Sequence, residues 1–123
     1  MTPTRKLAMA FAAARGIYGV ALVAVPGRIG TSWLGDDAGR RAVHVPLRGL
    51  GARDVALSAG TIDAALRGRS LLPWLLGSLG CDLTDLAATL LARDAVPERA
   101  RRGTLALAGG SAAAAAALAI GEA

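Results

Sequence analysis

Charged residues interrupt the apolar stretches of this sequence at two places where their spacing could support chemistry. Asp82 and Asp85 stand three residues apart in "DLTD", so on a helix both carboxylates project from one face. Arg53 and Asp54 stand together in "RGLGARD", which opens an otherwise apolar segment. Carboxylates beside an arginine can serve as a general acid and a general base, or they can bind a cation.

The candidate site residues are ionisable or aromatic groups inside or beside apolar segments. They are Asp54, Asp82 and Asp85 as catalytic groups if the protein is an enzyme, and Arg15, Arg48, Arg53 and Tyr18 as binding groups. Arg48 stands nearer the end of its segment, where its side chain can extend to the membrane surface. The chain has one cysteine and one histidine, so it lacks zinc-ligand spacing, and we expect neither a metal nor a cofactor.

Four apolar segments must position these residues. They span residues 7–25, 45–66, 71–92 and 103–121. Each has the ~20 residues that a helix needs to cross a bilayer. Polar connections join them, the longest at residues 26–44. The sequence therefore predicts an all-α fold, a four-transmembrane-helix antiparallel bundle that forms one membrane domain over residues 1–123.

Small residues recur at every fourth position within three of these segments. The sets are Ala8, Ala12 and Gly16, then Ala52, Ala56 and Gly60, then Ala106, Gly110 and Ala114. This spacing lets helix backbones approach closely in lipid. We expect these stripes to lie at helix contacts.

The composition favours a membrane protein. Hydrophobic residues make up 54% of the chain and charged residues 19%, against roughly 25% charged in an average globular domain. Only four aromatic residues are available to fill a core. Two alternatives stay open: a soluble Ala-rich helical bundle, and a cleaved signal peptide ending near residues 12–14.

Three segments carry charge to a similar depth, close to the middle of the bilayer. The residues concerned are Arg15, Arg53, Asp54, Asp82 and Asp85. A lone charge there costs about 3 kcal/mol even on insertion scales, so we expect these groups to pair with one another. They include one carboxylate more than they have guanidinium groups. An ion-pair cluster that only holds the helices together is the alternative to a functional site.

The net charge of +5 does not indicate nucleic-acid binding, because the basic residues are scattered between the segments and are not interleaved with aromatic residues. The expected partner is the lipid bilayer. A lipid-like or small organic ligand, and a second copy of the chain in a homodimer, stay open as further partners.

The patterns R-x-L-G-A-R-D and D-x-x-D, with Arg15-Gly16 and Pro26, resemble those of small four-helix bacterial integral membrane proteins of unassigned function. The resemblance implies a four-helix fold in a bacterial plasma membrane and no particular reaction. "DLTD" is also similar to the start of the CDP-alcohol phosphotransferase motif. However, Leu86 stands where that motif has glycine, and its later aspartates are missing, so a two-metal site is not expected.

Three kinds of function fit the expected charge cluster. The first is a binding or transport-type module for a cationic or lipid-like ligand. The second is a membrane-embedded enzyme in which aspartates carry out acid and base steps of an isomerisation, cyclisation or hydrolysis of a lipid-like substrate. The third is a structural or accessory membrane subunit.

Overall fold

The structure is a computed structural model that describes all of residues 1–123. Five α-helices and one short 3₁₀ helix account for the fold, and there is no strand, so the predicted all-α class is confirmed. In chain order the elements are α1 (Pro3–Ala24), α2 (Pro26–Leu34), η1 (Gly35–Gly39), α3 (Arg41–Leu66), α4 (Leu72–Leu91) and α5 (Glu98–Glu122).

Helix boundaries follow local sequence signals. Thr2 caps α1, its Oγ1 accepting a hydrogen bond of 3.2 Å from the backbone nitrogen of Arg5, and Pro3 occupies the first turn. Pro26 begins α2, where its missing N–H is not needed. Beyond the end of α3, Gly68 adopts a φ of +66°, which favours glycine. The four long helices cover the predicted segments to within one residue, and α1, α3 and α5 begin earlier than predicted.

The segment at residues 26–44, predicted as a polar connection, is instead helical for most of its length. It forms α2, then η1, then the first turn of α3. Ile29, Trp33 and Leu34 on α2 pack around a small core of Leu22 and Leu47. Such a short helix gains its stability from this packing more than from its own sequence, so periodicity alone did not reveal it.

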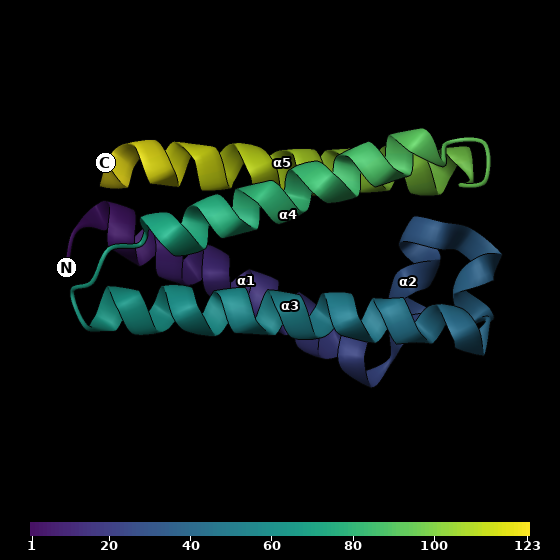
Figure 1. Cartoon of the computed structure of the whole chain (residues 1–123), viewed down its shortest axis with the longest axis horizontal. Coiled ribbons are helices and arrows are strands. Elements are labelled where there is room, and N and C mark those ends of the chain that lie inside the picture. The colour runs from purple at the N-terminus through teal and green to yellow at the C-terminus, as the bar shows by residue number, and fades with distance from the viewer.

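The long helices associate as two close pairs, α1 with α3 and α4 with α5 (Figure 1). Between the pairs, α1 touches α5 and α3 touches α4 much less extensively. The chain reverses direction between successive long helices, so both termini lie at the same end of the molecule, and α2 lies at the opposite end (Figure 1).

Two apolar clusters hold the ends of the molecule. The larger one joins α1, α3, α4 and α5 near the termini; its buried members are Ala8, Ala64, Ala65, Leu71, Leu75 and Ala119. The smaller one gathers Leu22, Ala38 and Leu47 beside α2. Between these clusters the buried side chains are largely polar, including Arg15, Asp54 and Asp82.

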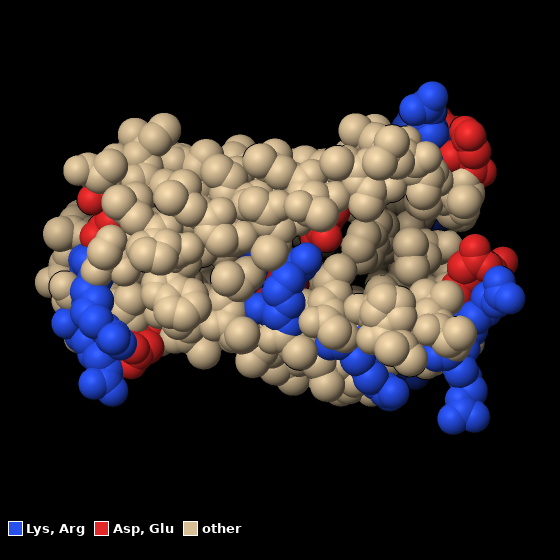
Figure 2. All heavy atoms as spheres, in the orientation of Figure 1, with Lys and Arg blue, Asp and Glu red and all other residues tan.

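The outer surface is apolar along the middle and charged at the ends. Figure 2 shows most of the Lys, Arg, Asp and Glu atoms at the two ends, with one blue group and a few red atoms in the middle of the wide band between them. Large apolar side chains stand exposed on this band, among them Ile17, Leu83 and Leu107. Three helices, α1, α4 and α5, are long and apolar enough to cross a membrane. The 26-residue α3 is long enough, but it is not among them.

Candidate functional site

Arg15 lies at the centre of the buried charges. It is near the middle of α1, on the face that also buries Ala12 and Gly19. Its Nε donates to Asp54 Oδ1 at 3.1 Å, and its Nη1 donates to Asp82 Oδ2 at 3.0 Å. Its Nη2 lies 3.0 Å from an oxygen of each carboxylate. One guanidinium group therefore joins α1 to both α3 and α4, using the planar fork that only arginine offers.

A second guanidinium group extends this network. Nη2 of Arg53 lies 2.9 Å from Asp85 Oδ2 and 3.4 Å from Asp54 Oδ1, and Nη1 lies 3.3 Å from Asp85 Oδ1. Asp82 and Asp85 project from one face of α4, as their spacing predicted. The five side chains thus form a continuous row, Asp82, Arg15, Asp54, Arg53 and Asp85. We name this row the ion-pair chain.

Ser111 of α5 completes the ion-pair chain, and sequence reasoning missed it. Its hydroxyl donates to Asp82 Oδ2 at 2.6 Å and accepts a hydrogen bond of 3.3 Å from Arg15 Nη1. All four long helices consequently contribute to one polar network. The only signal in the sequence is a single hydroxyl in the middle of an uncharged Ala- and Gly-rich segment.

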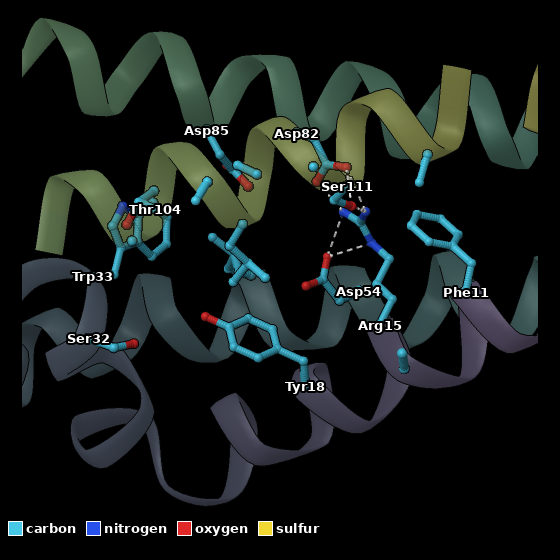
Figure 3. A pocket seen from close by; sticks show the side chains of 18 of the residues that line it. Phe11, Arg15, Tyr18, Ser32, Trp33, Asp54, Asp82, Asp85, Thr104 and Ser111 are labelled. Atoms are coloured by element: carbon cyan, nitrogen blue, oxygen red, sulfur yellow. Dashed lines mark hydrogen bonds and ion pairs between the residues drawn. The ribbon is translucent and has the colours of Figure 1, made fainter. Parts of the chain in front are cut away.

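A cavity of about 780 Å³ lies along the ion-pair chain, and all of the α-helices, α1 to α5, contribute to its lining. All five members of the chain line it, together with Ser111. Figure 3 labels Ser111 and the members Arg15, Asp54, Asp82 and Asp85. Three of the four aromatic residues of the protein, Phe11, Tyr18 and Trp33, also line it. The remaining wall consists mainly of small and apolar residues of α5. A cavity with apolar walls and a few convergent polar groups is the usual form of a small-molecule site.

The flank between α1 and α5 is one place where the cavity meets the surface. Ala14 on α1 and Ala106, Leu107 and Gly110 on α5 line it and are exposed. A Cβ atom added at Gly110 would meet nothing within 4 Å. The cavity therefore reaches the surface sideways, on the apolar band between α1 and α5.

Two acceptors on the cavity wall have no hydrogen-bond partner in the protein, and Arg53, which also lines the cavity, has a buried donor without one, its Nε. Asp54 uses only Oδ1 for its arginine contacts, and no group donates to its Oδ2. The hydroxyl of Tyr18 likewise makes no hydrogen bond. Figure 3 shows both atoms turned into the space between α1 and α5. The Asp54 side chain is only 6% exposed, so its free oxygen faces the cavity and little else.

The structure brings six of the seven predicted site residues together and leaves Arg48 apart. Arg15, Tyr18, Arg53, Asp54, Asp82 and Asp85 all line the cavity. Arg48 is exposed and donates from Nε to the backbone oxygen of Val23 at 3.1 Å, away from the ion-pair chain. No group of three or more His, Cys, Asp or Glu side chains is arranged to hold a metal ion.

Comparison with known protein families, with curated proteins and with solved structures finds no match to this chain. The resemblance inferred from the R-x-L-G-A-R-D and D-x-x-D patterns therefore stays a prediction. What can be concluded about function depends on the ion-pair chain and its cavity.

Proposed function

We propose that this chain is an integral membrane protein in which all four long helices cross the bilayer as an antiparallel bundle. The length and apolarity of α1, α4 and α5 support three of the spans. The fourth, α3, carries Arg53 and Asp54 in its middle, and both find partners on neighbouring helices, which lowers the cost of placing them in lipid. Apolar side chains are exposed along the middle of the molecule, and a lipid bilayer would cover this apolar surface.

Within that bundle we propose a binding or transport-type module for a cationic amphiphile that enters from the bilayer. The observation that carries the proposal is a cavity that opens on the apolar flank and ends at an ion-pair chain with one carboxylate in excess. A cationic group would balance this charge, and the rings of Phe11, Tyr18 and Trp33 offer favourable faces to it. The apolar walls of the cavity would contact the apolar tail of the amphiphile.

A second function is favoured by one particular arrangement. Arg53 contacts the carboxylates of both Asp54 and Asp85, and all three line the cavity. An arginine between two carboxylates can keep one ionised as a base while the other serves as an acid. A membrane enzyme that opens or isomerises a lipid-like substrate would use these groups. Incubation with a long-chain terminal epoxide tests it: diol formed by the native protein, and not by the Asp54→Asn variant, would favour catalysis.

Matched detergents of opposite charge test the binding proposal directly. A Trp74→Phe variant in phosphatidylcholine vesicles leaves Trp33, which lines the cavity, as the only tryptophan reporter. Dodecyltrimethylammonium should change its fluorescence at a concentration about tenfold lower than dodecyl sulfate does. Asp85→Asn should weaken the response to the cation. Asp63→Asn, which removes an exposed carboxylate from the same helix as Arg53, should not.

Equal responses to the cation and the anion would contradict the proposal. So would an Asp63→Asn variant that loses as much cation binding as Asp85→Asn does.

A further inference from the structure

The free oxygen of Asp54 defines a position inside the cavity that lacks a hydrogen-bond donor. The oxygen is not sealed inside the protein, because the buried side-chain atoms without a partner are Arg53 Nε and Ser58 Oγ. A carboxylate oxygen that faces a cavity and has no partner in the protein gains from a donor placed there. Every arginine nitrogen that reaches Asp54 contacts Oδ1, and none contacts Oδ2. Oδ2 therefore has its full capacity to accept hydrogen bonds from a molecule in the cavity.

The hydroxyl of Tyr18 presents a second acceptor to the same space (Figure 3). Tyr18 lies one turn along α1 from Arg15, and its hydroxyl bonds to no protein group. Its position in the cavity wall is held by packing beside Leu22 and Leu47. A ligand with more than one donor can thus bond to Asp54 and Tyr18 together.

These two acceptors narrow the kind of cation that fits. A quaternary ammonium group has no N–H, so it would balance the charge and leave both oxygens without donors. A primary ammonium group has three N–H donors in a compact head. The ion-pair chain has an excess of one carboxylate, which matches a single positive charge.

The position of the opening constrains the rest of the ligand. The side chains between the acceptors and the surface are small or apolar, including Ala14, Ala106 and Gly110. A charged or strongly hydrated tail would lose its water there without gaining partners. An alkyl chain that passes between α1 and α5 into lipid makes no hydrogen bonds to water, so it has none to lose.

We infer that the ligand is a primary alkylammonium amphiphile whose N–H groups bond to Asp54 Oδ2 and Tyr18 Oη. The inference rests on the proposed binding function and names the chemical class for the same cavity. The head lies beside the ion-pair chain, and the tail leaves between α1 and α5.

Dodecylamine and dodecyltrimethylammonium separate this inference from the broader proposal. Both are cations at neutral pH with the same tail, and they differ in N–H donors. In the Trp74→Phe background in phosphatidylcholine vesicles, we expect Trp33 fluorescence to report about tenfold tighter binding of dodecylamine. Equal binding of the two cations would overturn the inference and leave the cation-binding proposal standing. Binding of neither would overturn both.

Two variants identify the acceptors. Tyr18→Phe removes no hydrogen bond within the protein, so it should fold normally and lose part of the preference for dodecylamine while keeping its affinity for dodecyltrimethylammonium. Asp54→Asn should lose most of the preference, with Asp63→Asn as the control on the same helix. A full preference retained in both Tyr18→Phe and Asp54→Asn would overturn the assignment.

Discussion

At the scale of single residues, Arg15 makes the largest contribution to the buried network. Its side chain is 7% exposed and pairs with Asp54 and Asp82, which are almost equally buried. Removal of one partner from a buried ion pair leaves an uncompensated charge, which costs far more than the pair contributes in itself. Arg15 is therefore the residue at which the structure is most sensitive to substitution.

We predict that Arg15→Gln lowers the free energy of unfolding by about 3–5 kcal/mol, because Asp54 and Asp82 lose their shared cation. Thermal unfolding in detergent, followed by circular dichroism, measures the change. Arg48→Gln is the matched control, since Arg48 is exposed and bonds only to the backbone oxygen of Val23. Indistinguishable unfolding of the two variants would contradict the central position of Arg15.

The sequence was sufficient to predict that the charged residues in the middle of the helices pair with one another. It did not reveal the uncharged side chain that bonds to them. Arg15, Asp54 and Asp82 lie near the middle of separate apolar segments, and the cost of a lone charge in lipid predicts that they pair. Ser111 carries no charge, so the same reasoning says nothing about it. Its contact with Asp82 depends on the rotation of α5, which its nearly uniform alanine sequence does not specify.

At the scale of helices, glycine sets how closely α1 and α3 approach. A Cβ atom on Gly51 would lie 2.5 Å from the backbone oxygen of Gly19, and one on Gly19 would lie 2.6 Å from that of Gly51. The two backbones thus touch one turn away from Arg15 and Asp54. This close approach brings the short aspartate within reach of the guanidinium group.

We predict that Gly51→Ala destabilises the protein by about 1–3 kcal/mol, because α1 and α3 must separate to admit the methyl group. Gly49→Ala, two residues earlier on α3, has nothing within 4 Å of the added atom. That variant should be stabilised by about 0.5–1 kcal/mol through its higher helix propensity. Thermal unfolding of both proteins measures the contrast, and a Gly51→Ala protein as stable as Gly49→Ala would contradict it.

The stripes of small residues were only partly informative about helix contacts. Gly16 does pack against Ser58, as the first stripe predicted. The second stripe is wrong at Ala52 and Ala56, which are exposed on α3. The contact face of α3 is instead the one that carries Asp54, because pairing with Arg15 fixes the rotation of the helix. In an Ala-rich chain, small residues occur on every face, so charge is the more selective signal.

At the scale of the whole molecule, the apolar surface and the charged interior reverse the arrangement of a soluble protein. Large apolar side chains are exposed around the middle, while Arg15, Asp54 and Asp82 are buried there. The ends of the molecule carry most of the exposed charge (Figure 2). This pattern fits a bilayer around the middle of the bundle. In the membrane protein that we propose, the opening between α1 and α5 is a lateral entrance from lipid.

The central claim is that this lateral opening faces lipid near the middle of the bilayer. A spin label on Leu107→Cys in a Cys81→Ala background, in phosphatidylcholine vesicles, reports it through collisions with oxygen and with a nickel chelate. Leu107 lines the cavity and is exposed, whereas Ser70→Cys, in the connection between α3 and α4, provides the control position. We predict that oxygen reaches the Leu107 label and the nickel chelate does not, while both reach the Ser70 label. A Leu107 label that meets the nickel chelate as readily as the Ser70 label does would contradict the account.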